Sequence, residues 1–154
     1  MKDKAKKDVR MNDEMTGIRI GQSGIANIDG IMLFDLGIIV GNKLILCDIH
    51  IGLEDDFVSR GLLIPKHAMA DMIARFDKII SVNSSKNIRI SEIILNGDIK
   101  HDFGKVSDEE WRDAVKFINH IRQSCDNVVI VRGNHDTFAG PVAKKLGIKI
   151  ADSC

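Results

Sequence analysis

Short apolar runs recur along the chain, and longer segments with a different pattern separate the later ones. Turn residues such as Gly41-Asn42 bound several of these runs, which is typical of β-strands. The two runs IMLF and GIIV follow each other closely and are expected to form a hairpin. The pattern predicts strands at residues 31–34, 37–40, 43–47, 92–95, 127–131 and 148–151.

Three segments between the later strands have the periodicity of amphipathic helices. Apolar residues recur at helical spacing across residues 69–80, just after Pro65, which suits the first turn of a helix. Ser107 and Glu110 form a capping-box pattern, which predicts a second helix from 107 to about 123. A third, short helix is expected at residues 141–146.

Strands that alternate with helices predict an α/β layered domain. The strands are continuously apolar, which indicates that both faces of the sheet are covered. The length of 154 residues fits one domain. Residues 1–16 are highly charged and lack periodicity, so they are expected to be a disordered leader before a folded domain at 17–154.

Composition and charge exclude several classes of protein. Lys plus Arg equals Asp plus Glu, 22 of each, so no global basic field is available to hold nucleic acid. The first residues lack the apolar run of a signal peptide, and no stretch reaches the ~18 apolar residues of a membrane helix. The three cysteines are widely spaced and form no disulfide framework. We therefore expect a cytoplasmic protein without a membrane partner.

Polar clusters directly follow three of the apolar strands. LILC ends on Asp48-Ile-His50, EIIL ends on Asn96-Gly-Asp98, and VVIV is followed shortly by Gly133-Asn-His-Asp136. The carboxyl ends of parallel strands meet at one edge of a sheet, where α/β proteins bind their ligands. Taken alone, Asp48 and His50 would usually be surface residues, and the other two clusters are common in turns. Their repetition after three strands favours a shared site.

The residue types in these clusters are those of a metal site. Asp48 and His50 are two apart and could both reach one ion, and Asp98 could bridge to a second. Asn134 offers a neutral carbonyl oxygen. Imidazole mixed with carboxylate suits a transition-type divalent ion better than calcium. Two such ions ~4 Å apart form the clamp used for displacement at phosphorus.

With these motifs in this order, the chain resembles the calcineurin-like metallophosphoesterases over roughly residues 17–154. The segments DIHIGLEDDFVSRGLLIP and NGDIKHDFG further resemble an archaeal branch related to the bacterial ligase-associated DNA repair endonucleases. The resemblance implies a layered α-β-β-α fold, of which this chain would contain the N-terminal portion only. It also implies two divalent metal ions, with manganese preferred and iron or zinc as alternatives.

The resemblance assigns a role to each residue of the site. Asp48 and His50 would bind the first ion, Asp98 would bridge both, and Asn134 would bind the second. His135 would serve the phosphate or the leaving group as a hydrogen-bond or proton donor, and Asp136 would orient His135. A metal-activated water would attack phosphorus.

Two further residues are candidates for substrate binding. His101 lies three residues beyond Asp98, and Arg60 lies in the segment SRGLLIP. Either could contact a phosphate, and either could equally be an ordinary solvated loop residue.

The chain departs from the family pattern at its C-terminal side. The pattern continues with further histidines, including Gly-His-x-His, whereas no histidine follows His135 here. We therefore expect a truncated or split protein that lacks its C-terminal half, with an open sheet that favours poor solubility or a homo-oligomer. The first functional hypothesis is a phosphodiesterase or nuclease that acts on DNA or a nucleotide. The alternative is a non-catalytic remnant, or one subunit of a split phosphoesterase.

Overall fold

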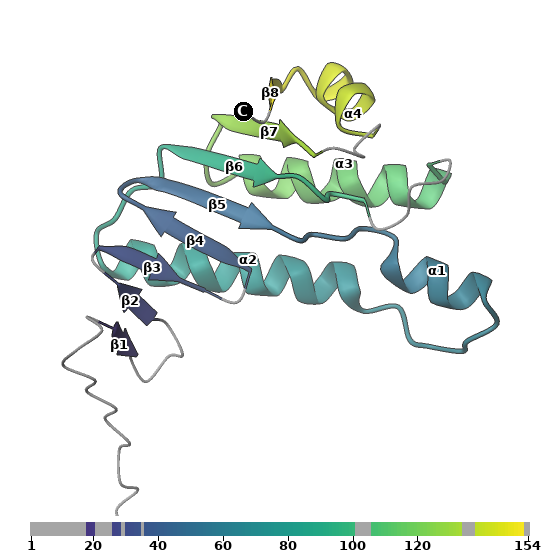
Figure 1. The fold of residues 1–154 in the computed structure, drawn as a ribbon, viewed down its shortest axis with the longest axis horizontal. Helices are drawn as coiled ribbons and strands as arrows, with labels where there is room; N and C mark the ends of the chain where they lie inside the picture. The colour runs from purple at the N-terminus through teal and green to yellow at the C-terminus, as the bar shows by residue number, and fades with distance from the viewer. Residues whose placement is uncertain are drawn as a thin grey trace, which may run out of the picture.

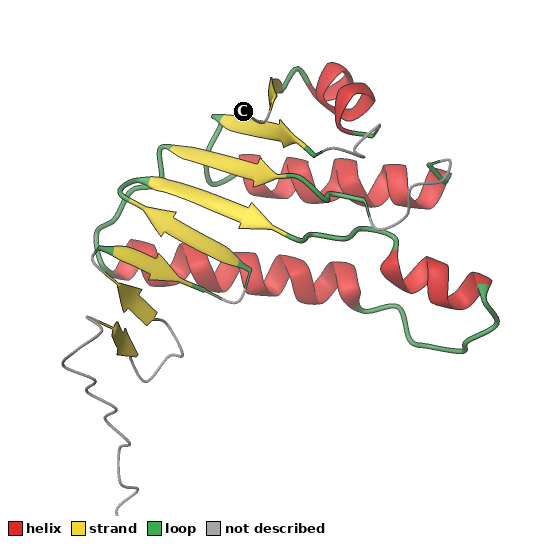
Figure 2. Cartoon of the chain, viewed as in Figure 1, coloured by secondary structure: helices red, strands yellow, loops and turns green. Residues whose placement is uncertain are grey.

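The computed structural model describes residues 18–20, 26–28, 30–34, 36–100, 106–133 and 138–152, which form one sheet with helices (Figure 2). The strands are β1 (Ile18–Ile20), β2 (Ala26–Ile28), β3 (Ile31–Leu33), β4 (Gly37–Val40), β5 (Lys43–Cys47), β6 (Glu92–Asn96), β7 (Val128–Arg132) and β8 (Lys149–Asp152). The helices are α1 (Leu53–Ser59), α2 (Ala68–Ser85), α3 (Asp108–Arg122) and α4 (Ala139–Leu146).

The order of the strands in the sheet follows their order in the chain. The first five strands pair antiparallel with their neighbours, and β5 to β8 pair parallel. Each parallel pair requires a crossover, and right-handed crossovers that all step in one direction place their helices on the same face. Helices α2 and α3 accordingly lie together behind the sheet (Figure 1).

The core lies between this sheet face and the helices. Leu44 and Leu46 of β5 alternate with outward residues and are fully buried, as are Ile93 and Leu95 of β6. Helices α2 and α3 meet them with buried side chains that include an edge-to-face pair, Phe76 and Phe117, whose ring centroids are 6.3 Å apart. Full burial of such a side chain contributes roughly 1.5–3 kcal/mol, so this face holds the domain together.

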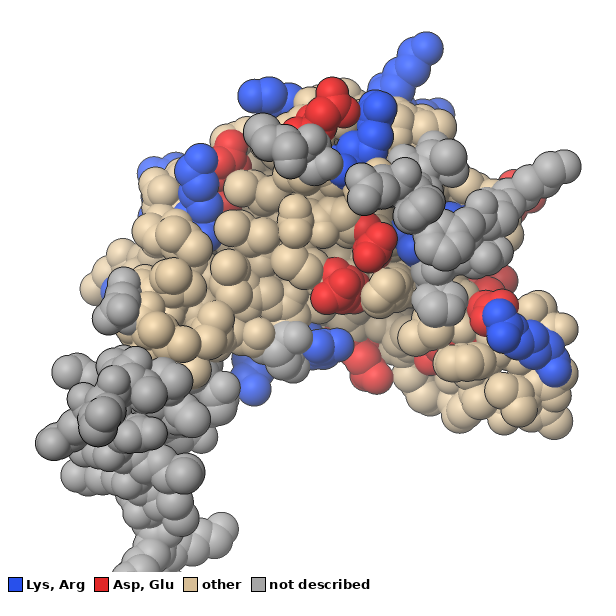
Figure 3. Space-filling model, in the orientation of Figure 1, with Lys and Arg blue, Asp and Glu red and all other residues tan. Residues whose placement is uncertain are grey.

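The opposite face of the sheet differs from the expectation of strands covered on both sides. Ile45 and Ile94 are paired neighbours on this face and are only partly buried. In the view of Figure 3 a broad area over the strands carries few charged side chains. The handedness of the crossovers explains this, because all the crossover helices occupy the other face. Poor solubility or self-association stays a prediction.

The predicted elements are largely confirmed, with shifted ends and additions. The capping box of α3 is present, because the Ser107 side chain accepts from the Glu110 amide and the Glu110 side chain accepts from the Ser107 amide. Helix α2 begins at Ala68, three residues after Pro65, and α4 begins two residues before Pro141. The sequence pattern did not predict α1, β1 or β2.

Two other observations concern the chain as a whole. In the part of the chain that the structure describes, no helix combines the length and the apolar character needed to cross a bilayer. The predicted leader, residues 1–16, lies outside the described residues.

Candidate metal centre

Three strand ends lie side by side at the carboxyl edge of the parallel sheet. Cys47 pairs with Asn96, and Asn96 pairs with Val131, so β5, β6 and β7 end at nearly the same level. Asp48 follows β5 directly, and Asp98 comes two residues after β6. The polar clusters therefore begin at one edge, as the sequence predicts. Asn134, His135, Asp136 and His101 lie outside the described residues.

Backbone hydrogen bonds hold the first two clusters together beyond the strands. The His50 amide donates to the Asp98 carbonyl oxygen at 3.0 Å, and the Ile51 amide donates to the Ile99 carbonyl oxygen at 2.8 Å. An isolated parallel bridge joins Ile51 to Lys100. The two loops thus continue the pairing of β5 and β6 and carry their side chains past the edge of the sheet.

The backbone at these residues has an unusual conformation. Asp48, His50 and Asp98 have φ angles of 53°, 48° and 44°, in the left-handed region. Asp and His enter this region more readily than most residues, yet such conformations cost of order 1–3 kcal/mol and persist only where the surroundings impose them. Left-handed residues of this kind gather at functional sites. Among the described residues, three of the four non-glycine residues with a positive φ lie at this edge.

The side chains at this edge present donor atoms to solvent. The Asp48 Oδ1 and His50 Nε2 atoms are 3.8 Å apart, with 76% of the Asp48 side chain exposed. The Nδ1 atom of His50 is buried, whereas Nε2 is the ring nitrogen that lies near the Asp48 carboxylate. The third cluster approaches closely, because a Cβ added at Gly133 would lie 3.7 Å from Asp98 Oδ1. This separation is an ordinary van der Waals contact, so the backbone at Gly133 lies beside the Asp98 carboxylate.

These donors fit a divalent ion in type. An imidazole and two carboxylates at adjoining strand ends suit a transition-type ion. Among the described residues, no three His, Cys, Asp or Glu side chains already converge on one point. Asp48 and His50 therefore form a pair, and Asp98 approaches from the neighbouring loop.

The sequence family described as calcineurin-like phosphoesterase matches residues 44–151, which include all three strand ends. The chain belongs to the calcineurin-like phosphoesterase family. Its mixed α/β structure is consistent with the metallophosphoesterase fold. The crystal structure of Pseudomonas putida nuclease MPE shares this fold with a TM-score of 0.53 at 22% sequence identity. That comparison covers 88% of this chain, which spans 58% of the nuclease chain. No curated protein matches the chain.

A cleft of about 700 Å³ opens beside the carboxyl edge of the parallel sheet. It extends from Asp48 and His50 along α1, α2 and α3, and acidic side chains outnumber basic ones in its lining. Burial raises the pKa of Asp113, one of these acids. A polyanion would be repelled from such a cleft.

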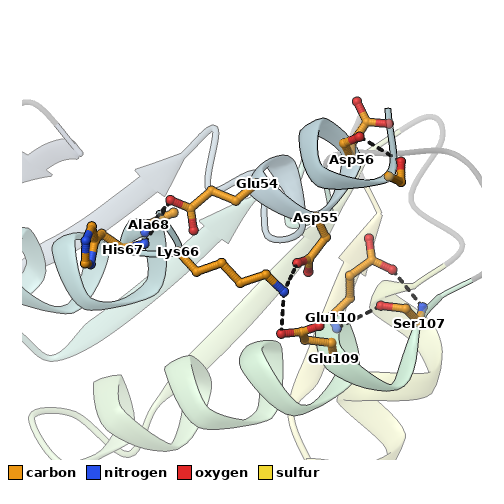
Figure 4. A network of polar contacts seen from close by, with 10 residues as sticks. Glu54, Asp55, Asp56, Lys66, His67, Ala68, Ser107, Glu109 and Glu110 are labelled. Atoms are coloured by element: carbon orange, nitrogen blue, oxygen red, sulfur yellow. Dashed lines mark hydrogen bonds and ion pairs between the residues drawn. The ribbon is translucent and has the colours of Figure 1, made fainter. Parts of the chain in front are cut away.

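Helix α1 lines part of this cleft, and its acidic side chains contact neighbouring segments through ion pairs and hydrogen bonds. Lys66 bridges it to α3, with Nζ 2.7 Å from Asp55 and 2.8 Å from Glu109 (Figure 4). Hydrogen bonds to these two carboxylates raise the pKa of Lys66 above its usual range. Glu54 accepts hydrogen bonds from the His67 and Ala68 amides and thereby caps the start of α2.

Arg60 lies at the C-terminal end of α1. Its Nε and Nη2 atoms lie 3.0 Å and 2.9 Å from the Asp56 carboxylate oxygens. The Arg60 side chain is 70% exposed, so this pair contributes little to stability. It does hold the guanidinium in a fixed place on the surface.

The sequence analysis missed one pair of residues next to the edge. Lys100 Nζ lies 3.1 Å from Glu110 Oε1, and the two side chains are only 7% and 8% exposed. The capping box identified Glu110 as a helix cap, but no sequence pattern pairs it with Lys100. Glu110 does not stand out in the sequence either, because the first turn of α3 also contains Asp108 and Glu109.

Proposed function

We propose that this domain hydrolyses phosphodiesters, in nucleic acid or in a nucleotide, with two divalent metal ions and manganese as the preferred metal. The observation that carries the proposal is the meeting of Asp48, His50 and Asp98 at one sheet edge, each in the left-handed conformation. Membership of the calcineurin-like phosphoesterase family supports the chemistry. The shared fold with the Pseudomonas putida nuclease supports the substrate class.

Each residue of the edge takes one role in this proposal. Asp48 and His50 hold the first ion, Asp98 reaches both, and Asn134 holds the second. When bound, the ions supply positive charge to the phosphate and lower the pKa of a nearby water. His135 gives a hydrogen bond or a proton to the leaving oxygen, and Asp136 keeps the imidazole oriented.

The substrate reaches this edge from the solvent side rather than through the cleft. Asp48 is largely exposed, whereas the cleft beside it is lined by more acidic than basic side chains, which disfavours phosphate. Arg60, an exposed cation at the C-terminal end of α1, is the residue that we assign to contact a phosphate next to the scissile one. His101, close to Asp98 in sequence, is the second residue that we assign to substrate binding.

Two substitutions test this proposal, one at the carboxyl ends of the strands and a control at the amino ends. We expect the wild-type chain to bind Mn²⁺ in calorimetry and to hydrolyse bis-p-nitrophenyl phosphate. Asp98→Asn should lower kcat/KM by about 100-fold or more, because the loss of an outer-shell partner alone costs 10–100-fold. Asp126→Asn is the matched control. Asp126 lines a cleft at the amino ends of the strands, so its replacement should leave both measurements unchanged.

The second candidate function is a non-catalytic subunit. It is favoured by the absence of a converged set of three donors among the described residues. A wild-type chain that binds no Mn²⁺ and hydrolyses no diester would support this alternative and exclude the enzyme. Activity that Asp98→Asn abolishes would exclude the alternative.

A further inference from the structure

The ion pair between Lys100 and Glu110 is buried next to the two loops that carry the proposed metal ligands Asp48, His50 and Asp98. The two side chains are 7% and 8% exposed, with Nζ and Oε1 3.1 Å apart. Burying two charges removes their hydration, so such a pair is a weak source of stability compared with apolar residues of the same size. Its position in the fold therefore needs another explanation.

Both oxygens of the Glu110 carboxylate have a fixed partner. Oε2 accepts a hydrogen bond from the Ser107 amide at 2.7 Å, and Oε1 faces Lys100. The Ser107 hydroxyl accepts in return from the Glu110 amide at 3.1 Å. The carboxylate is therefore locked to the first turn of α3 and cannot rotate without breaking one of these contacts.

The two metal-binding loops meet at this locked carboxylate. Gly52, two residues after His50, packs so closely that an added Cβ would clash with Oε1 and lie 2.8 Å from Cγ of Glu110. Lys100, two residues after Asp98, pairs with Ile51 in a parallel bridge. The loop of Asp48 and His50 therefore packs against the Glu110 side chain, whereas the loop of Asp98 contacts it through the Lys100 ammonium group.

We propose that Lys100 and Glu110 are a positioning pair, which sets the loop of Asp48 and His50 against the loop of Asp98. The pair touches neither substrate nor metal and acts through the backbone of both loops. A rigid base of this kind keeps the left-handed conformations at the ligands. The inference rests on the metal role given above to these three residues.

The neighbouring residue in α3 provides a matched control. Glu109 pairs with Lys66 at 2.8 Å, but these side chains are 47% and 45% exposed. The two pairs have the same chemistry and lie one residue apart on one helix turn. They differ in burial and in whether they contact the loops of Asp48 and Asp98, and Lys66 also pairs with Asp55 at 2.7 Å.

The test compares the double variants Lys100→Met/Glu110→Gln and Lys66→Met/Glu109→Gln in the full chain. Glutamine keeps the capping acceptor, and removing both charges leaves no buried charge unpaired. Hydrogen exchange of the His50 and Ile51 amides is followed by NMR in metal-free protein. We expect exchange about tenfold faster in the first variant and little changed in the second, because the opening is local.

Several results would overturn the positioning role. Equal exchange in the two variants would do so, as would a rise that extends equally to the amides of Ile93 to Leu95 in β6. A first variant that fails to fold would assign the pair to overall stability instead. Lys100→Arg keeps a cation opposite Glu110 and is expected to retain protection, whereas protection lost in Lys100→Arg as in the methionine variant would count against the role.

Mn²⁺ affinity is the second readout. We expect the first double variant to bind Mn²⁺ about tenfold more weakly by calorimetry, as for other supporting residues of metal sites. Unchanged affinity would contradict the inference. If the wild-type chain binds no Mn²⁺, the proposed function fails, and the exchange rates still decide whether the pair orders the loops.

Discussion

The two ends of the parallel strands have clefts of similar size and different chemistry. The cleft at the carboxyl ends, about 700 Å³, includes Asp48 and His50. The cleft at the amino ends, about 660 Å³, is lined by residues such as Asn42 and Asn127, and no histidine lines it. Volume alone therefore does not distinguish the ends. The donor types do, because an imidazole lies among carboxylates at the carboxyl ends.

Polar groups at the amino ends are used to join the strands to one another. The Ser91 amide donates to the Asn42 carbonyl at 2.9 Å, and Lys43 and Glu92 form an ion pair at 2.6 Å. At the carboxyl ends, the Asp48 side chain instead remains largely exposed. A polar residue whose hydrogen bonds serve the fold is less available to a ligand than one that the fold holds out to solvent.

The largest expected effect is on the free energy of unfolding, and it compares one glycine at each end of the strands. Gly52→Ala should lower the free energy of unfolding by about 3 kcal/mol, combining the ~1–2 kcal/mol of a left-handed alanine with the overpacking against Glu110. Gly41→Ala, in the turn at the amino end of β5, should cost only about 1–2 kcal/mol. Gly41 has a φ of 61°, and an added Cβ there would meet nothing within 4 Å. Urea unfolding of both variants measures the difference, and equal losses would contradict the close packing at the carboxyl edge.

An intermediate effect is expected from two exposed arginines. Arg60→Ala should raise KM for a diester several-fold and leave kcat and stability nearly unchanged, since its pair with Asp56 is exposed. Arg89→Ala, in the cleft at the amino ends, should change neither constant. Steady-state kinetics on both variants tests the assignment. An Arg60→Ala enzyme with unaltered KM would remove Arg60 from substrate binding.

The smallest effect is a pH dependence from an ion pair at the amino ends. The hydrogen bond from Lys43 lowers the pKa of Glu92 from its usual 4.5. A lowered folded-state pKa means that this stabilisation is complete above pH 4.5 and is lost as the pH falls further. Glu92→Gln should therefore lower Tm slightly at pH 7 and less at pH 3, with Mn²⁺ binding unaltered. A Tm difference that grows toward pH 3 would contradict this assignment.

Long periodic elements and strand-end motifs could be predicted from the sequence, and local packing could not. The apolar spacing in α2 and the capping box of α3 are signals that depend only on neighbours in sequence. Helix α1 has no buried residue and no side-chain cap at Gly52, so periodicity could not reveal it. Strands β1 and β2 have three residues each, which is too short for an alternating pattern to stand out.

The residue types of the site could be predicted from the sequence, but the contacts that hold these residues in place could not. Asp48, His50 and Asp98 follow apolar strands, so their gathering at one edge follows from the topology of parallel sheets. Their left-handed conformation and the Lys100–Glu110 pair depend on contacts between a loop and a helix. Such contacts are set by three-dimensional packing, and a single sequence contains no period or motif that encodes them.

The strand order also has a consequence for the growing polypeptide. Every strand lies beside the one that precedes it in the chain, so each new strand extends an edge that has already been synthesised. At ~5–20 residues per second, the ribosome releases Asp48 and His50 seconds before Asp98. The edge that carries Asp48, His50 and Asp98 can therefore be assembled in the order of translation, because no strand among the described residues is inserted between two earlier ones.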